Sequence, residues 1–134
     1  MPRHLLVIDD EPFIGRIVRM QFERGPYRVS VALDGRSGLD FLLANRDVDL
    51  VLLDINMPGM SGLEVLEEAR GSPALAPTHF VVLTAAGDQK HVDRARELGV
   101  MAFLTKPFSP RKLYRQVAEL LGDAVEPDLG GEGG

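Results

Sequence analysis

The sequence contains no cysteine, no long apolar run and no stretch in which basic and aromatic residues alternate. Without cysteine the chain can form neither disulfides nor thiolate metal sites, and nothing in it points to an oxidising compartment. Its apolar runs are far shorter than the ~20 residues that a membrane-spanning helix requires. The N-terminal segment reaches acidic residues too early for a signal peptide. We therefore expect a cytoplasmic protein with no membrane partner.

The composition is that of an ordinary globular domain, with 134 residues, of which 45% are hydrophobic and 26% are charged. The formal net charge of −5 comes mainly from the last twelve residues, so that residues 1–122 carry a charge of −1. We expect a folded domain over residues 1–122, followed by a disordered acidic, Gly-rich tail or the start of a linker over residues 123–134.

Charge is also unevenly distributed inside the expected domain. Residues 89–118 hold seven basic and two acidic residues. This excess favours an acidic partner surface or a salt-sensitive dimer contact there. Because basic and aromatic residues do not interleave, direct nucleic-acid binding is not expected.

Five short apolar segments alternate with segments of helical periodicity. The expected strands are residues 4–9, 27–32, 48–54, 79–84 and 101–105. Three of them are nearly continuous apolar runs, as in strands that are buried on both faces. Residues 27–32 alternate instead, which favours an edge strand. Repeated strand–helix units predict an α/β fold with a five-stranded parallel sheet, helices on both faces and right-handed crossovers.

The expected helices have recognisable starts. Pro12 precedes an apolar stripe that begins with Phe13, and Leu43 belongs to the stripe of the second helix. Ser61 and Glu64 have the spacing of a capping box. Residues 89–98 carry only three apolar residues at helical spacing, so we expect this helix to be weakly anchored.

Polar side chains gather where the strands end. Asp9 and Asp10 end the first strand, Asp54 the third and Thr84 the fourth, and Lys106 follows the fifth. Ligands of open α/β sheets bind outside the carboxyl ends of the strands, so these residues should converge on one edge of the sheet.

Each of these residues also has an ordinary structural explanation. Acids near a helix N-terminus interact well with the helix dipole, Asp54 could simply occupy a turn, Lys106 could be a solvated loop lysine, and Thr84 could be a plain strand residue. However, several buried carboxylates at one edge raise one another's pKa or require a cation. Mg²⁺ suits a site of a few carboxylates and retained waters.

Four motifs, "VIDDEP", "LLDINMPGMSG", "LTA" and "FLTKPF", resemble in order those of the receiver domain of two-component response regulators. The resemblance covers about residues 4–121. The receivers that the chain resembles are of the chemotaxis-regulator-like kind. It implies a doubly wound, flavodoxin-like sheet with strand order 2-1-3-4-5. The residues to which it assigns roles are the phosphoacceptor Asp54; the Mg²⁺ ligands Asp9, Asp10, Asp54 and the backbone carbonyl of Asn56; the phosphoryl-stabilising Thr84 and Lys106; and the switch aromatic Phe103.

The function implied by this resemblance is a phosphorylation-activated signalling switch, not an enzyme acting on other substrates. A sensor histidine kinase or a phosphotransfer protein would donate the phosphoryl group to Asp54 in a Mg²⁺-dependent reaction. The surface formed by residues 89–98, the fifth strand and the last helix would then change. The partners would be a downstream protein target or a C-terminal output domain, with a phosphorylation-dependent homodimer as a further option.

An alternative from the enzyme class is an aspartate-nucleophile phosphatase of the haloacid dehalogenase type. That family has a second acid two residues after the nucleophile, in the pattern D-x-D-x-T/V. Here Asn56 and Pro58 occupy the two later positions, which disfavours this alternative. A nucleotide-binding module is also disfavoured, because no G-x-x-x-x-G-K-S/T loop follows any expected strand.

Overall fold

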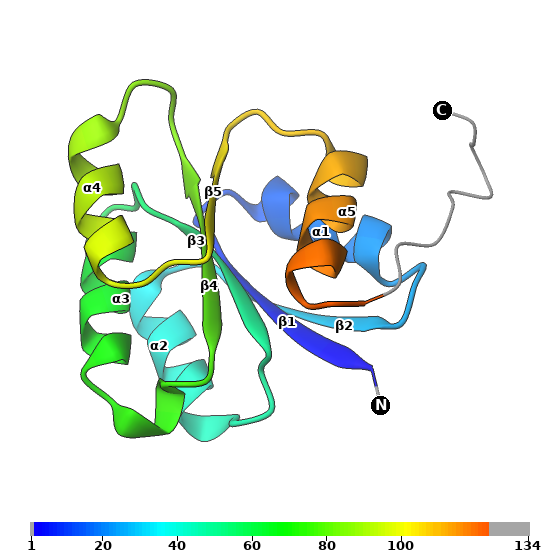
Figure 1. Cartoon of the computed structure of the whole chain (residues 1–134), viewed down its shortest axis with the longest axis horizontal. Coiled ribbons are helices and arrows are strands. Elements are labelled where there is room, and N and C mark those ends of the chain that lie inside the picture. Colours follow the sequence, from blue (N-terminus) through cyan, green and yellow to red (C-terminus); the bar gives the residue numbers. More distant parts are fainter. Residues whose placement is uncertain (1, 124–134) are drawn as a thin grey trace.

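Five strands and five α-helices alternate along residues 2–123, the part of the chain that the computed structural model describes (Figure 1). None of the helices in this part is long and apolar enough to cross a membrane. The elements are β1 (Arg3–Ile8), α1 (Pro12–Phe22), β2 (Tyr27–Ala32), α2 (Gly35–Ala44), β3 (Leu50–Asp54), α3 (Gly62–Arg70), the 3₁₀ turn η1 (Pro73–Leu75), β4 (His79–Thr84), α4 (Gln89–Glu97), β5 (Ala102–Thr105) and α5 (Pro110–Leu120).

The strands form one parallel sheet in the order β2-β1-β3-β4-β5, which confirms the predicted fold. The central strands β1, β3 and β4 are almost completely buried, as their continuous apolar sequences predicted. β2 lies at one edge with its alternating sequence, and the half-buried β5 lies at the other. β1 and β3 are neighbours, and Ile8 pairs with Leu53, so their carboxyl ends lie side by side.

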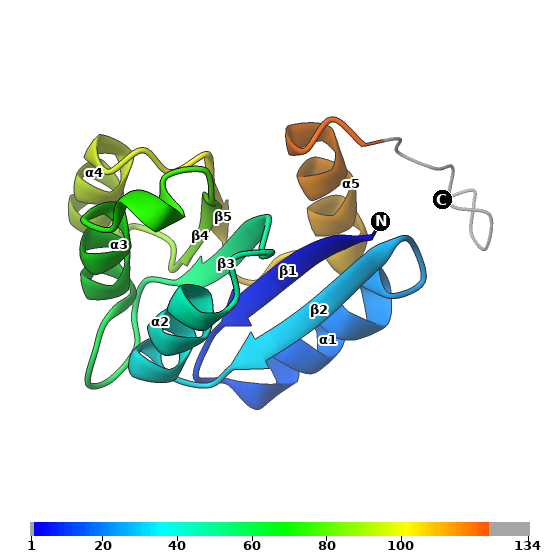
Figure 2. The same ribbon diagram turned by 90° about the horizontal axis from the view of Figure 1, so that it is seen from below.

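The helices cover both faces of this sheet (Figures 1 and 2). On one face, α1 and α5 pack Val18 and Leu113 against Leu5 and Val7 of β1 and their neighbours. On the other face, α2, α3 and α4 cover a second cluster around Leu6 and Ile8. Successive side chains of a strand point to opposite faces, so one buried strand supplies both cores.

Local signals in the sequence account for several of the observed helix ends. Ser61 and Glu64 form both hydrogen bonds of the predicted capping box at the start of α3. Ser109 accepts a hydrogen bond from the backbone N–H of Lys112 at the start of α5. In the turn before α3, Gly59 has a φ of 73°, a backbone conformation that glycine adopts without strain.

The predicted apolar stripes were wrong at two positions. Phe13 and Leu43 are 47% and 41% exposed, respectively. The buried face of α1 contains Ile14 and Val18 of the predicted stripe, together with Gly15 and Phe22. Gly15 brings α1 close to β2, since a Cβ there would lie 2.7 Å from a methyl group of Val31. This close approach fixes the rotation of α1 and leaves Phe13 outside the core.

The helix α4 is weakly anchored by apolar contacts, as predicted, because Ala95 is its one buried residue. Polar contacts to α3 supplement this packing. The guanidinium of Arg70 donates to the carbonyl oxygens of Leu98 and Gly99, and Arg94 pairs with Glu67. α4 is therefore held to its neighbour largely by hydrogen bonds and ion pairs.

Asp123 is tied to the folded body. Its carboxylate accepts hydrogen bonds from the guanidinium of Arg3 and from the hydroxyl of Tyr27. The first residue of the expected tail is thus hydrogen-bonded to the folded body. The rest of the expected tail, residues 124–134, lies outside the described residues.

The contact between α3 and the end of β3 leaves no room for a side chain at Gly62. A Cβ at this position would lie 2.2 Å from the carbonyl oxygen of Asp54 and 2.7 Å from the Cα of Ile55. We predict that Gly62→Ala lowers the free energy of unfolding by about 1–3 kcal/mol, since backbone atoms must move. Urea denaturation measures this change.

The matched control is Gly71→Ala at the other end of α3. Gly71 has a φ of −79°, and its Cβ would meet no atom nearer than 3.4 Å. We expect a change of less than about 0.5 kcal/mol. Similar losses in the two variants would contradict the assigned close approach.

Candidate functional site

Three carboxylates converge at the carboxyl edge of the sheet, as the sequence predicted. Asp9 and Asp10 follow β1, and Asp54 ends the neighbouring β3. Asp9 is 1% exposed and Asp54 is 4% exposed, whereas Asp10 is partly exposed. One oxygen from each of the three side chains lies within 4.8 Å of the others. Like charges are therefore concentrated in a buried place.

The two oxygens of Asp9 have different surroundings. Oδ1 accepts a hydrogen bond of 2.9 Å from the backbone N–H of Glu11. Oδ2 lies 2.8 Å from Nζ of Lys106 as an ion-pair contact, yet it is buried without a directed hydrogen bond. The ammonium thus neutralises Oδ2 without occupying its lone pairs in a well-directed bond, so that these stay available for a ligand. Burial raises the pKa of Asp9, although Lys106 opposes this shift.

Asp54 is held by the chain that follows it. Its Oδ1 accepts a hydrogen bond of 3.1 Å from the backbone N–H of Asn56, and its Oδ2 lies 3.5 Å from Nζ of Lys106. Burial, followed by the negative charge of Asp9, raises the pKa of Asp54 to about 6. At neutral pH the ionised carboxylate is therefore less stable than a solvated one and benefits from any added positive charge.

Lys106 reaches the acids as predicted, but Asp54, the first partner that its position beside the acid cluster favours, is not its nearest one. Nζ lies 2.8 Å from both Asp9 and Glu11, and it is farther, at 3.5 Å, from Asp54. Burial would lower the pKa of Lys106, but its close contacts with the carboxylates of Asp9 and Glu11 outweigh burial and raise it. The ammonium is thus shared among three carboxylates, with Asp54 the most distant of them.

The sequence did not reveal the role of Glu11. Its place directly before Pro12 predicts a helix-start residue that borders the site, and Glu11 does stand at the N-cap of α1, without a side-chain capping bond. Its carboxylate instead accepts a hydrogen bond from Lys106. The one available signal was its position directly after the Asp9–Asp10 pair.

The two other predicted residues of the phosphoryl and switch set lie on β4 and β5. Thr84 is 5% exposed at the end of β4, and its hydroxyl donates a bond of 3.2 Å to the carbonyl of Ala85. Phe103 on β5 is half-buried, and the guanidinium carbon of Arg96 lies 5.2 Å from the centre of its ring. This distance is that of a cation–π contact.

Asn56 connects the site to the start of α4. Its side-chain amide donates a hydrogen bond of 3.1 Å to Oδ2 of Asp88. Burial alone would raise the pKa of Asp88, but the bonds from Asn56 and His91 lower it. Asp88 was not predicted as a site residue, because nothing local in the sequence relates it to Asn56.

The residues present fit a divalent cation that prefers oxygen ligands. Asp9, Asp10 and Asp54 supply carboxylate oxygens only, and one of these, Oδ2 of Asp9, is buried without a directed hydrogen bond. Hard cations such as Mg²⁺ bind this kind of donor set. The backbone carbonyl of Asn56, also predicted as a ligand, belongs to the loop that follows Asp54.

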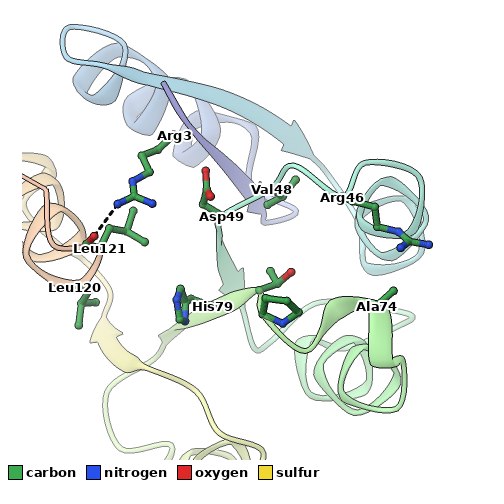
Figure 3. A pocket seen from close by; sticks show the side chains of 10 residues that line it. Arg3, Arg46, Val48, Asp49, Ala74, His79, Leu120 and Leu121 are labelled. Atoms are coloured by element: carbon green, nitrogen blue, oxygen red, sulfur yellow. Dashed lines mark hydrogen bonds between the residues drawn. The ribbon is translucent and has the colours of Figure 1, made fainter. Parts of the chain in front are cut away.

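A hollow of about 230 Å³ lies at the opposite end of the sheet, where the strands begin (Figure 3). Arg3, Asp49 and His79 line it, and Arg3 is occupied by a hydrogen bond to the carbonyl of Leu121. The acid cluster is therefore not in this hollow but at the other end of the sheet, where the strands finish.

Comparison with known proteins gives a consistent picture. A family model described as "Response regulator receiver domain" matches residues 5–118. Transcriptional regulatory protein ResD of Bacillus subtilis is 38% identical over 122 residues, which are 91% of this chain and 49% of ResD. Response regulator SaeR of Staphylococcus aureus is 34% identical over 118 residues, which are 88% of this chain and 50% of SaeR. The chain spans about half the length of these relatives.

Solved structures agree with the fold. The chemotaxis protein CheY4 of Vibrio cholerae superposes with a TM-score of 0.82 at 27% identity, covering 90% of this chain and 99% of CheY4. A CheY-like receiver domain protein from Methanospirillum hungatei also gives 0.82, at 28% identity and with 91% and 95% coverage.

The raised pKa of Asp54 predicts a pH-dependent stability of the metal-free protein. The folded state keeps the Asp54 proton up to about pH 6, whereas the unfolded chain releases it near pH 4. The folded state therefore binds more protons in this window, and the free energy of unfolding falls as pH rises through it. We expect Asp54→Asn to be more stable than wild type by about 1–3 kcal/mol at pH 7, and by much less below pH 4.

Urea denaturation in the presence of EDTA measures this difference. Glu119→Gln removes an exposed carboxylate at the end of α5 and serves as the control, with no comparable gain. A gain for Asp54→Asn that is the same at both pH values would contradict the role of ionisation.

Proposed function

The chain belongs to the response regulator receiver domain family, and on that premise we propose that Asp54 is its phosphoacceptor. The observation that carries this proposal is the meeting of Asp9, Asp10 and Asp54 at the edge that Lys106 also reaches. Receiver domains serve signalling, and we propose that this one catalyses only its own phosphorylation and dephosphorylation.

The proposed transfer uses a phosphohistidine of a sensor histidine kinase or of a phosphotransfer protein. An oxygen of Asp54 attacks phosphorus, the new P–O bond forms as the P–N bond breaks, and the leaving imidazole nitrogen keeps the electron pair and takes a proton from solvent. Carboxylates are established nucleophiles for making acyl phosphates. The backbone N–H of Asn56 holds one oxygen of Asp54 and so orients the other.

Lys106 would contribute charge stabilisation. Its ammonium already lies 3.5 Å from Asp54 and is shared with Asp9 and Glu11. A small movement away from Glu11 would bring it to an oxygen of the transferred group. A fixed positive charge of this kind stabilises the charge that develops during phosphoryl transfer.

We propose that Asp9, Asp10, Asp54 and the backbone carbonyl of Asn56 hold Mg²⁺. When bound, the ion would supply positive charge for the phosphoryl oxygens. The chain itself orients two of these ligands. The backbone N–H of Glu11 holds the carboxylate of Asp9, and the backbone N–H of Asn56 holds that of Asp54, before a cation binds.

The proposed switch begins at Thr84 and ends on the α4-β5-α5 surface. The hydroxyl of Thr84 makes a long bond to the Ala85 carbonyl and could turn toward a phosphoryl group. Phe103 would then leave its contact with Arg96 and change rotamer. Such changes bias an equilibrium between existing conformations, and the weakly packed α4 is suited to follow them.

The partners of this switch are proposed in the same way. ResD is called a transcriptional regulatory protein; for this chain we propose a downstream protein target or a C-terminal output domain, and a phosphorylation-dependent homodimer as a further option. We place the protein in the cytoplasm. The haloacid dehalogenase alternative finds no support in the comparisons, and Asn56 stands where that family has its second acid.

Mg²⁺ binding has a direct test in thermal unfolding. We expect millimolar Mg²⁺ to raise the midpoint of unfolding by roughly 2–5 °C, because a ligand that binds only the folded state stabilises it. The double variant Asp9→Asn/Asp10→Asn should lose this shift. Asp40→Asn, which removes an exposed carboxylate of α2, should keep it. An equal shift in all three proteins would contradict the proposed ligands.

Phosphoryl transfer can be tested with acetyl phosphate and Mg²⁺ followed by intact-mass measurement. We expect the wild type to gain one phosphoryl group and Asp54→Asn to gain none. Lys106→Met should react at about one tenth of the wild-type rate or below. Asp40→Asn again serves as the control and should label like the wild type.

Labelling that survives Asp54→Asn, or that needs no divalent cation, would contradict the proposed function. Steady turnover of unrelated phosphate esters would favour a phosphatase instead.

A further inference from the structure

A continuous line of hydrogen bonds runs from Asp54 to the helix α4. The backbone N–H of Asn56 donates to Oδ1 of Asp54 at 3.1 Å, and the side-chain amide of Asn56 donates to Oδ2 of Asp88 at 3.1 Å. The other oxygen of Asp88 lies 2.7 Å from Nδ1 of His91. One residue, Asn56, thus contacts both the proposed phosphoacceptor and the loop before α4.

The side chain of Asp88 bonds to Asn56 and does not cap its own helix, α4. It stands at the N-cap of α4, where an aspartate normally accepts a hydrogen bond from a backbone N–H of the first turn. Here the side chain makes no such capping bond. Its carboxylate instead reaches Asn56, 32 residues earlier in the sequence. An N-cap aspartate that does not cap its own helix, and bonds to a distant residue, is a candidate for a functional role.

His91 fixes the orientation of Asp88. It is the third residue of α4, and its ring nitrogen Nδ1 contacts the oxygen of Asp88 that Asn56 does not use. The side chain of Asp88 is 16% exposed, and that of His91 is 44% exposed. Each oxygen of Asp88 therefore has a partner, and the two contacts together fix the plane of the carboxylate.

The bond to Asp88 restricts what the amide of Asn56 can do. An asparagine amide offers two N–H donors and one acceptor, and it can orient a water molecule when it is free to turn. With one N–H committed to Asp88, the plane of the amide is fixed toward α4. We propose that Asp88 is a positioning residue that holds the Asn56 amide away from the water route to phosphorylated Asp54 and thereby prolongs the lifetime of the phosphoryl group.

This inference rests on the proposed phosphorylation of Asp54. In the hydrolysis at issue, the oxygen of a water molecule attacks phosphorus, and the P–O bond to Asp54 breaks. The carboxylate of Asp54 leaves with the electron pair, and a proton of the water passes to the phosphate or to solvent. Orienting the water in line with the breaking bond speeds this step, so an amide that is free to orient it shortens the lifetime.

The test follows the loss of the phosphoryl group from the whole chain. The protein is loaded with acetyl phosphate and Mg²⁺, the donor is removed by rapid desalting, and the phosphorylated fraction is measured by intact mass over time. We expect Asp88→Ala to shorten the half-life by about three- to tenfold, which is the scale of one hydrogen bond of ordinary net strength.

Three further variants separate positioning from general disturbance. Asp88→Asn keeps an acceptor for Asn56 and should have a half-life close to that of the wild type. The double variant Asp88→Ala/Asn56→Ala lacks the freed amide and should lose the acceleration. Asp93→Ala removes a carboxylate from the exposed side of the same helix and should leave the half-life unchanged.

The outcomes are distinct. An unchanged half-life in Asp88→Ala overturns the inference, as does a double variant that hydrolyses as fast as Asp88→Ala alone. Either result leaves the proposed function intact, because the wild type has taken up its phosphoryl group. A wild-type chain that takes up none overturns the proposed function, and this inference with it.

Discussion

The site depends on the burial of several negative charges around one positive charge. Asp9 and Asp54 are almost fully buried, and Asp10 lies beside them. A single ammonium, that of Lys106, is divided among Asp9, Glu11 and Asp54. This leaves excess negative charge in a place of low dielectric, where it is unfavourable. The proposed Mg²⁺ would offset this excess and so assist the proposed transfer of a phosphoryl group to Asp54.

The fold makes this concentration of charge unavoidable. Because β1 and β3 are parallel neighbours in the centre of the sheet, the residues that follow them must meet at one edge. The close contact of Gly62 with the end of β3 fixes the chain just after Asp54. In contrast, α4 is held mainly by polar contacts. A rigid acid cluster next to a loosely packed helix is an arrangement in which a local change of charge can move a neighbouring surface.

Much of this could be predicted from the sequence, because the signals were local. Continuous apolar strands, the capping box at Ser61 and the order of polar strand ends determine the sheet and the acid cluster. The rotation of α1 could not be predicted, since it is set by the contact of Gly15 with Val31 across two elements. The partners of Lys106 and the bond between Asn56 and Asp88 likewise depend on distances that only the folded chain defines.

The central claim, that Asp54 accepts the phosphoryl group at a site completed by Lys106, has its most direct test in a crystal structure with Mg²⁺ and beryllium fluoride. Beryllium trifluoride bound to a carboxylate stands in for a phosphoryl group. The account predicts that it is attached to an oxygen of Asp54, with Nζ of Lys106 moved from Glu11 to a fluoride and Mg²⁺ bound by Asp9 and Asp10. Attachment to another carboxylate, or a Lys106 that remains on Glu11, would contradict it.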